Sequence, residues 1–210
     1  MPSPNFIYIV DDDEAVRQSL ATLLEAVGYN VRSFAEAELF LEAAASLPPG
    51  CLIADVRMPG IDGLELQRRL HDRALRFPVI IVTGHADVPL AVRAMKAGAL
   101  DIIEKPFTAP AILTSVRAAL AQSASEPPQS AGHDAADPEA VAKIAQLSPR
   151  EREVLAGLLA GLPNKTMAYD LSISPRTVEI HRARVMDKTS SRSLSELIRL
   201  ALAAGLQPRA

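Results

Sequence analysis

Reactive polar side chains directly follow four apolar, strand-like runs in this sequence. Asp55 ends the run that starts at Cys51 and precedes a Pro-Gly turn. The other three positions are the acids Asp11, Asp12 and Asp13 after Phe6–Val10, Thr83 after Pro78–Val82, and Lys105 after Ile102-Ile103. Ligands of an open parallel sheet bind at the carboxyl ends of its strands, so we expect these groups to meet at one edge. Acids, a hydroxyl and an ammonium around one carboxylate predict a magnesium-assisted phosphoryl acceptor.

Each group has a definite role in such a site. Asp11, Asp12 and Asp55 would give Mg2+ a half-filled shell of oxygen ligands, and their mutual repulsion favours a bound cation. Asp55 would attack phosphorus, while Lys105 and the Thr83 hydroxyl stabilise charge on the transferred group. Taken singly, these residues are also typical helix caps, turn residues or solvated surface residues. Their joint position at strand ends favours the chemical interpretation.

The elements that would position these groups alternate between strand and helix. Strands are expected at Phe6–Val10, Asn30–Phe34, Cys51–Asp55, Pro78–Val82 and Asp101–Glu104, and helices at Glu14–Val27, Ala35–Leu47, Leu64–Arg73, Val88–Ala97 and Pro110–Leu120. Five such units with continuously apolar strands predict an α/β domain over residues 1–122. Its expected architecture is a five-stranded parallel, doubly wound sheet covered on both faces.

The rest of the chain has a different pattern. Residues 123–138 (SASEPPQSAGHDAADP) lack apolar periodicity and predict a linker. Residues 139–210 predict an all-α domain of four helices. The first begins at a capping box, Ser148-Pro149-Arg150-Glu151, the second is capped by Asn164, the third runs from Ser174 to about Lys188, and the fourth begins at Ser193. The short turn between the second and third helices indicates a helix-turn-helix.

Composition separates the two halves by charge. Residues 1–122 carry 15 acids and 11 bases, residues 123–138 three acids and no base, and residues 139–210 seven acids and 11 bases. The basic C-terminal part therefore favours nucleic acid as a partner. No apolar run is long enough for a membrane span, and Cys51 is the only cysteine. We expect a cytoplasmic protein with no membrane contact.

The first-half motifs resemble the receiver domain of bacterial two-component response regulators. The matching segments are Ile9–Glu14, Asp55–Gly60, Val82–His85 and Glu104–Phe107. The resemblance implies that a sensor histidine kinase phosphorylates Asp55. It also implies that Asp11, Asp12, Asp55 and the backbone carbonyl of Arg57 bind Mg2+, and that Thr83 and Lys105 contact the phosphoryl group. The Lys105-Pro106 peptide is typically cis in this family.

One position departs from the receiver pattern. Receivers commonly place an aromatic switch residue three positions before the lysine, and here that residue is Ile102. The usual coupling between a hydroxyl and an aromatic ring therefore cannot operate unchanged. We expect Thr83 still to move toward the phosphoryl group while Ile102 repacks.

The C-terminal motifs resemble the helix-turn-helix output domains of the LuxR/NarL class. Leu147–Leu155, Gly161–Lys165 and Ile173–His181 carry this resemblance, and FixJ-type regulators look closest within the class. The resemblance implies a transcription factor that binds double-stranded promoter DNA and acts with RNA polymerase. It also hints at genes for nitrogen fixation or low-oxygen respiration.

Helical geometry predicts which side of the third helix meets DNA. Val178 and Val185 share a face and should dock on the domain, which leaves Glu179, Ile180 and Ala183 on the opposite face. An acid can accept from cytosine N4, and aliphatic groups can touch thymine methyls. The candidate DNA-binding residues are Lys165, Arg176, Thr177, Glu179, Ile180, Arg182, Ala183, Arg184 and Lys188. The basic residues among them suit phosphates.

The expected response to phosphorylation is homodimerisation. In this family the responding surface often includes the fourth helix and fifth strand, where the candidate residues are Val88, Val92, Arg93, Met95, Lys96 and Asp101. An apolar stripe rimmed by complementary charges would pair across a two-fold axis. The apolar stripe of the last helix is a second candidate contact.

Two other functions are compatible with parts of the sequence. An aspartyl phosphatase would turn over small phosphate esters, but it predicts an acid two residues after the nucleophile, where Arg57 stands. A constitutive DNA-binding protein with a silent receiver would use only the C-terminal part. We therefore expect a phosphorylation-activated regulator, and no enzymatic activity beyond phosphoryl transfer to itself and slow self-dephosphorylation.

Overall fold

A computed structural model describes residues 5–84, 88–124 and 137–206 of the chain. They form two compact units, one built on a β-sheet and one built of helices alone. No helix of the described residues is long and apolar enough to cross a membrane.

The sheet of the first unit has five parallel strands in the order β2-β1-β3-β4-β5. They are β1 (Phe6–Val10), β2 (Asn30–Phe34), β3 (Gly50–Asp55), β4 (Val79–Thr83) and β5 (Asp101–Glu104). The bounds of β1, β2 and β5 match the sequence prediction. Strand β3 begins one residue earlier than predicted, and β4 is shifted by one residue toward the C-terminus. The predicted doubly wound architecture is confirmed.

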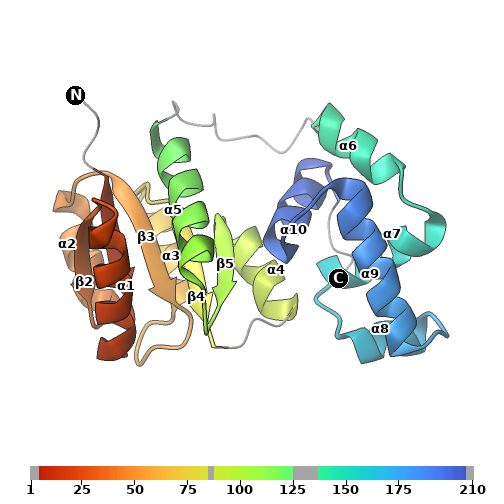
Figure 1. The fold of residues 1–210 in the computed structure, drawn as a ribbon, viewed down its shortest axis with the longest axis horizontal. Coiled ribbons are helices and arrows are strands. Elements are labelled where there is room, and N and C mark those ends of the chain that lie inside the picture. Colours follow the sequence, from red (N-terminus) through yellow and green to blue (C-terminus); the bar gives the residue numbers. More distant parts are fainter. Residues whose placement is uncertain (1–4, 85–87, 125–136, 207–210) are drawn as a thin grey trace. The chain divides into compact units, whose positions relative to one another are not determined.

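Helices cover both faces of the sheet. Their bounds are α1 (Glu14–Ala26), α2 (Ala37–Ala43), α3 (Gly63–Asp72), α4 (Val88–Lys96) and α5 (Ala109–Ala124), with a 3-10 turn at Ala44–Ser46. Figure 1 shows α1 and α5 on one face and α2 and α3 on the other. Since α5 continues to Ala124, it enters the predicted linker, whose residues 125–136 lie outside the described part of the chain.

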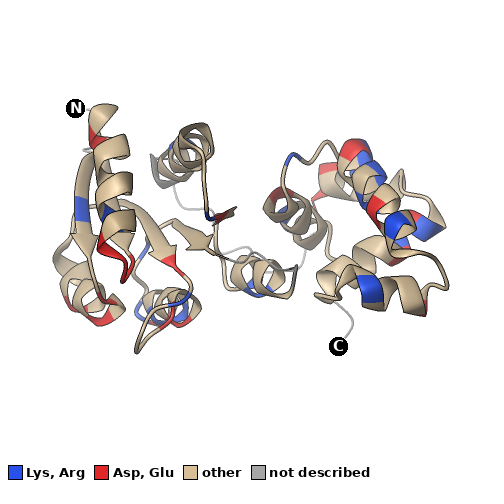
Figure 2. Ribbon diagram, turned by 60° about the horizontal axis from the view of Figure 1, so that its bottom comes forward, with Lys and Arg blue, Asp and Glu red and all other residues tan. Residues whose placement is uncertain are grey.

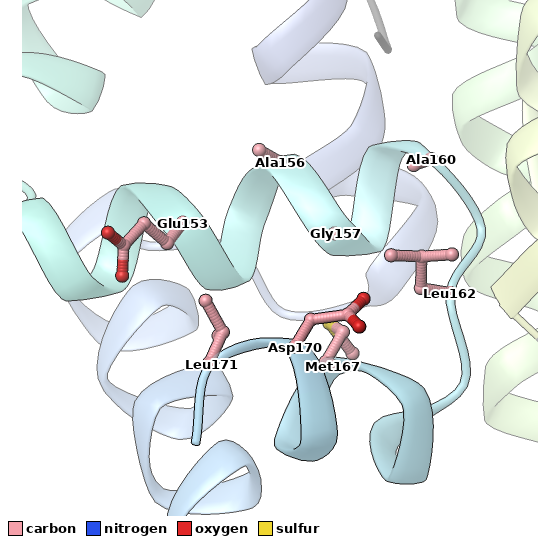
Figure 3. Close-up of a pocket in the computed structure, with 8 residues that line it drawn as sticks. All are labelled: Glu153, Ala156, Gly157, Ala160, Leu162, Met167, Asp170 and Leu171. Atoms are coloured by element: carbon pink, nitrogen blue, oxygen red, sulfur yellow. The ribbon is translucent and has the colours of Figure 1, made fainter. Parts of the chain in front are cut away.

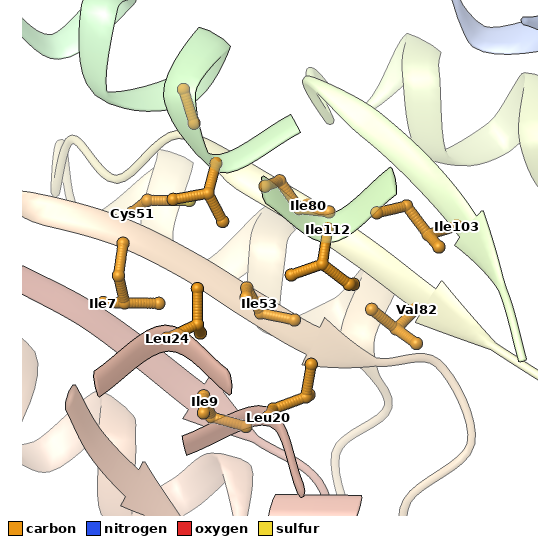
Figure 4. Close-up of a cluster of buried hydrophobic side chains, with 12 residues drawn as sticks. Ile7, Ile9, Leu20, Leu24, Cys51, Ile53, Ile80, Val82, Ile103 and Ile112 are labelled. Carbon is orange, nitrogen blue, oxygen red and sulfur yellow. The ribbon is translucent and has the colours of Figure 1, made fainter. Parts of the chain in front are cut away.

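Strand alternation divides the core between the two faces. Ile7 and Ile9 of β1 point into the cluster beneath α1 and α5, together with Ile53 of β3 (Figure 4). The intervening Tyr8 lies on the other face, where its ring contacts Phe40 of α2. Complete burial of one such aliphatic side chain contributes about 1.5–3 kcal/mol. The packed sheet is therefore a rigid base for the groups at its carboxyl edge.

The second unit has five helices among the described residues, one more than the sequence patterns predicted. They are α6 (Pro138–Ala145), α7 (Pro149–Leu159), α8 (Asn164–Asp170), α9 (Pro175–Thr189) and α10 (Leu194–Ala203). The additional helix, α6, begins inside the predicted linker, and its N-cap Asp137 accepts from the backbone N–H of Glu139.

Capping accounts for most helix starts in this unit. The predicted capping box is present: the Ser148 hydroxyl accepts from the Glu151 N–H, and the Glu151 carboxylate accepts from the Ser148 N–H. Ser174 and Ser193 cap α9 and α10 as expected. The predicted short helix is present as α8, but its predicted cap was wrong, because Pro163 holds the cap position and Asn164 is already helical.

Apolar stripes hold the helical unit together. Val178 and Val185 of α9 are both fully buried, as predicted for the docking face of that helix. The stripe of α10 was expected to offer a dimer contact, but Leu197, Ile198 and Ala201 are buried in the structure. That stripe therefore contributes to the core rather than to an exposed surface.

Helices α7 and α8 pack closely at Gly157. A Cβ there would lie 2.6 Å from Met167 Sδ, so only glycine allows Met167 to pack this closely against α7. Figure 3 shows these two residues in the groove between the two helices.

Candidate functional site

A lysine bridges two aspartates at the carboxyl edge of the sheet. The Nζ atom of Lys105, just after β5, lies 2.7 Å from Asp11 Oδ2 and 2.7 Å from Asp55 Oδ1. Both aspartates are buried, with relative exposures of 2% and 6%. The strand order places β1, β3 and β5 in one parallel sheet, so their last residues reach the same edge. The predicted convergence of Asp11, Asp55 and Lys105 is present.

Local backbone geometry fixes Asp55. Its second carboxylate oxygen accepts a hydrogen bond from the backbone N–H of Arg57 at 2.5 Å. Gly63, the first residue of α3, lies so close that a Cβ there would overlap the backbone carbonyl of Asp55. Sequence reasoning did not identify Gly63, although its place after the N-cap Asp62 was the available signal. Only a residue without a side chain lets α3 begin against this strand end.

Asp11 is held from within its own loop. Its Oδ1 atom accepts from the backbone N–H of Asp13 at 2.9 Å, and Arg17 of α1 donates to the backbone carbonyls of Asp11 and Asp12 at 2.7 and 3.0 Å. Arg17 is a second positioning residue that sequence reasoning missed. The sequence signal for this role was the position of Arg17, one turn into the helix that follows three acids. Asp12 itself is exposed.

Burial and hydrogen bonds shift the pKa values of two members of this cluster. Burial raises the pKa of the Asp11 carboxyl, although hydrogen bonds from Lys105 and Asp13 lower it. Burial would lower the pKa of Lys105, but its hydrogen bonds to Asp11 and Asp55 outweigh that effect and the pKa is raised. A single ammonium thus faces two acids, which favours a further cation at this edge.

Thr83 and Lys105 are coupled through the backbone. The Lys105 N–H donates to the carbonyl of Thr83 at 2.7 Å, and Thr83 is fully buried at the end of β4. The Lys105-Pro106 peptide is cis. This hydrogen bond joins the end of β4 to the residue that follows β5.

The residues of the predicted dimer surface lie on α4 and β5. Arg93 and Lys96 are exposed on α4. Asp101 is half-buried and accepts a hydrogen bond from Ser115, and the side chain of Val88 lies outside the described residues. The role of these residues in dimerisation stays a prediction.

The outer face of α9 has the predicted exposure. Ile180 is 46% exposed, and Glu179, Ala183, Arg176 and Arg184 are exposed as well. Thr177 is half-buried, and its N–H donates to the Ser174 hydroxyl that caps the helix. Figure 2 shows basic positions along the helices of this unit, interspersed with acidic ones. Lys165 on α8 is also exposed.

Two of the predicted phosphate contacts hold helices together. Arg182 donates to Asn164 Oδ1 at 3.2 Å, which ties α9 to the start of α8. Lys188 Nζ lies 2.7 Å from Glu151 Oε2 and 3.4 Å from the carbonyl oxygen of Gln146. The hydrogen bond from Lys188 lowers the pKa of Glu151 to about 2. Both basic residues therefore have a structural partner, and their contact with DNA stays a prediction.

The comparisons with known proteins cover both units. Residues 7–117 match the response regulator receiver domain, and residues 145–201 match the bacterial regulatory proteins of the luxR family. The transcriptional regulatory protein FixJ of Azorhizobium caulinodans is 52% identical over 208 residues, which is 99% of this chain and 97% of that protein. The FixJ of Bradyrhizobium diazoefficiens is 48% identical over 98% of both chains. This chain belongs to the LuxR-type response regulators.

Solved structures agree with this assignment. Full-length FixJ from B. japonicum is 48% identical over 97% of this chain and 98% of its own, with a TM-score of 0.55. The response regulator StyR is 37% identical over 95% of this chain and 98% of its own, with a TM-score of 0.56. As a two-component response regulator with a DNA-binding domain, the chain has a sensor kinase and DNA as its classes of partner.

Receiver domains typically bind Mg2+, and the donor set of this response regulator suits that ion. Asp11 and Asp55 offer buried carboxylate oxygens that already share one cationic partner. The full three-acid site is not assembled, however, because no group of three His, Cys, Asp or Glu side chains is near enough to hold a metal within the described ranges. The exposed Asp12 would have to turn inward to complete the shell.

Proposed function

We propose that this response regulator is a transcription factor controlled by phosphorylation of Asp55. A sensor histidine kinase supplies the phosphoryl group, the modified chain forms a homodimer, and the dimer binds promoter DNA and activates transcription with RNA polymerase. The observation that carries this proposal is the Lys105 ammonium, 2.7 Å from both the Asp55 and the Asp11 carboxylates, in a chain that also has a DNA-binding domain.

The proposed chemistry is a single phosphoryl transfer. An Asp55 carboxylate oxygen attacks the phosphorus of a phosphohistidine, the new P–O bond forms, and the P–N bond to the imidazole breaks. Lys105 would pair with the phosphoryl oxygens instead of with the carboxylate that it now contacts. Mg2+, bound through Asp11, Asp12, Asp55 and the Arg57 carbonyl, would supply positive charge to the same oxygens.

Movements of Thr83 and Ile102 would couple the added negative charge to a change in the structure of the receiver surface. The acyl phosphate carries about one more negative charge than the free carboxylate and three further acceptor oxygens, which attract the Thr83 hydroxyl. Because Ile102 is half-buried and pairs with Ile81 in the sheet, displacement of Thr83 leaves space that its aliphatic chain can fill. A coupling free energy of about 1–3 kcal/mol would suffice for the switch.

Dimerisation would use α4 and β5 of the receiver. The proposed surface is formed by Val88, Val92, Arg93, Met95, Lys96 and Asp101, and it would pair with a second copy across a two-fold axis. Dimerised output domains would then match half-sites about 34–36 Å apart, or a multiple of that distance.

The proposed target genes rest on the resemblance to FixJ-type regulators. The FixJ-type resemblance favours nitrogen-fixation or low-oxygen genes, and the 52% identity to a FixJ protein supports it. The more distant response regulator TmoT is 41% identical over 92% of this chain, so similar regulators with other names share the architecture.

Acetyl phosphate with Mg2+, followed by sizing and a DNA mobility-shift assay, tests this function. The proposal requires stable labelling, dimerisation and tighter DNA binding together. Continuous release of inorganic phosphate without dimerisation would support an aspartyl phosphatase instead. DNA binding that is insensitive to the donor would support a constitutive DNA-binding protein. Self-dephosphorylation is the only hydrolysis that we propose.

A further inference from the structure

Arg17 joins helix α1 to the acid loop that precedes it, which is formed by Asp11, Asp12 and Asp13. Its Nη1 atom donates to the backbone carbonyl of Asp11 at 2.7 Å and to that of Asp12 at 3.0 Å. Arg17 itself is half-buried and lies one turn into α1. The helix thus holds the backbone of the loop through one guanidinium.

The three acids of the loop differ in their other contacts. The carboxylate of Asp11 is bonded to Lys105 and to the N–H of Asp13, and the carboxylate of Asp13 caps α1. The carboxylate of Asp12 is exposed and makes no hydrogen bond or ion pair with the described part of the chain. The hydrogen bond from Arg17 to its carbonyl is therefore what holds Asp12 in place.

Arg17 bonds to carbonyls although acids surround it in the sequence. Four consecutive acids, Asp11–Glu14, lie three to six residues before it, yet Arg17 makes no ion pair with any acid of the described ranges. A guanidinium usually forms its strongest hydrogen bonds with a carboxylate. Because Arg17 donates to the backbone instead, the carboxylate of Asp12 stays available to another cation.

We propose that Arg17 is a positioning residue for Mg2+. It holds the backbone of the acid loop in the position from which the Asp12 carboxylate can turn toward an ion bound by Asp11 and Asp55. This inference rests on the proposed function, which assigns Mg2+ to these three acids. Groups that orient metal ligands without touching the metal change metal affinity by about 10–100-fold when they are removed.

The charge of Arg17 has the opposite effect from its hydrogen bonds. Its positive charge lies close to the acid loop and repels a divalent cation. If Arg17 acted only through charge, its removal would tighten Mg2+ binding. If it positions the loop, its removal weakens Mg2+ binding. The sign of the change in affinity therefore distinguishes the two roles.

Arg17→Met removes the hydrogen-bond donors and keeps an unbranched side chain on α1. The dissociation constant of Mg2+, measured by calorimetric titration of the full-length chain, should rise about tenfold. The Mg2+ concentration for half-maximal labelling by acetyl phosphate should rise equally, while the labelling rate at saturating Mg2+ stays within about twofold, because the loop acts on ion binding. Arg117→Met, on the exposed side of α5 in the same unit, removes an equal charge and should change neither quantity.

A combined substitution tests whether Arg17 acts through Asp12. In an Asp12→Asn background, Arg17→Met should weaken Mg2+ binding by less than about twofold further, because the carboxylate that Arg17 positions is already gone. An equal tenfold loss in both backgrounds would overturn the proposal. Unchanged or tighter Mg2+ binding by Arg17→Met alone would overturn it as well.

Arg17→Lys provides the test if Arg17→Met does not fold. Lysine keeps the charge but lacks the planar fork of donors, so the dissociation constant should rise about threefold. Native affinity in a folded Arg17→Lys chain would contradict the proposal.

The same titration separates this inference from the proposed function. A native chain that neither binds Mg2+ nor accepts a phosphoryl group would overturn both. A native chain that does both, beside an Arg17→Met chain with equal Mg2+ affinity, would overturn the role of Arg17 alone.

Discussion

Each unit of the chain contains a lysine whose Nζ atom lies 2.7 Å from a carboxylate oxygen of a buried acid. The two clusters differ in their balance of positive and negative charges. In the receiver, Lys105 faces two acids, Asp11 and Asp55. In the DNA-binding unit, Lys188 faces one acid, Glu151, which also accepts from the Ser148 N–H. The first cluster keeps an excess acid, whereas the second is neutral.

The pKa values of the acids in the two clusters also shift in opposite directions. The pKa of Asp11 is raised, mainly by burial, while that of Glu151 is lowered to about 2, mainly by its hydrogen bond from Lys188. A carboxylate whose charged form is destabilised can be stabilised by an additional cation. A carboxylate that is already stabilised by its own cation gains little from another one. In the DNA-binding unit such a pair joins α7 to α9, whereas for the receiver cluster we propose a role in ligand chemistry.

Removal of the receiver lysine should have the largest effect. Lys105→Met takes away the only cation observed between the two carboxylates of the described site. We expect the rate of phosphorylation by acetyl phosphate to fall about 100-fold or more, as for the loss of one charge-stabilising donor. Intact-mass measurements over time give the rate, and Lys96→Met on the exposed side of α4 is the control. A rate within twofold of the native value would contradict the assigned role.

Removal of the second pair should alter stability instead. Glu151→Gln should lower the Tm of the DNA-binding unit by about 5 °C at pH 7 without a change in phosphorylation rate. Since the folded pKa of Glu151 is lowered from 4.5 to about 2, its contribution is complete above pH 4.5 and is lost as pH falls toward 2. The native Tm should therefore fall across that window more than the Tm of the variant. Parallel Tm curves for the two proteins would show that the pair does not stabilise the fold.

Substitutions on α9 and α8 should separate the recognition of bases from the binding of phosphates. Ile180→Ala should relax sequence preference by about 1 kcal/mol and leave the salt dependence of DNA binding unchanged. Lys165→Ala should weaken binding to all sequences and reduce the salt slope by about one unit. Affinities for a selected operator and a scrambled one, measured at several salt concentrations, distinguish the two. Equal salt slopes for both variants would refute this division of roles.

The smallest effect is expected at the switch position. Ile102→Ala should leave phosphorylation intact and weaken the coupling to dimerisation by a few-fold, because the shortened side chain no longer fills the space beside Thr83. Sedimentation of phosphorylated native and variant chains measures this. Unchanged dimerisation would exclude a role for Ile102.

Sequence patterns located the receiver site because its three main side chains all lie at or just after the ends of strands. Strand ends in a parallel sheet must meet at one edge, so Asp11, Asp55 and Lys105 could be brought together from their positions alone. Gly63 and Arg17 were missed because their roles depend on backbone approach and on a long side chain, neither of which has a periodic signal.

The helical unit was harder to predict in detail. Burial of Val178 and Val185 followed from helical periodicity, but the pairing of Lys188 with Glu151 joins residues 37 positions apart and needs the tertiary packing of α7 and α9. Periodicity indicates which side chains share a face, not what covers it.

The most direct test of the receiver assignment compares phosphoryl uptake by the native chain and by Asp55→Asn. Both proteins are incubated with acetyl phosphate and Mg2+, and intact mass reports the fraction that carries one phosphoryl group. We predict labelling of the native chain together with dimerisation, and neither for Asp55→Asn. Equal labelling and dimerisation of the two proteins would contradict the account.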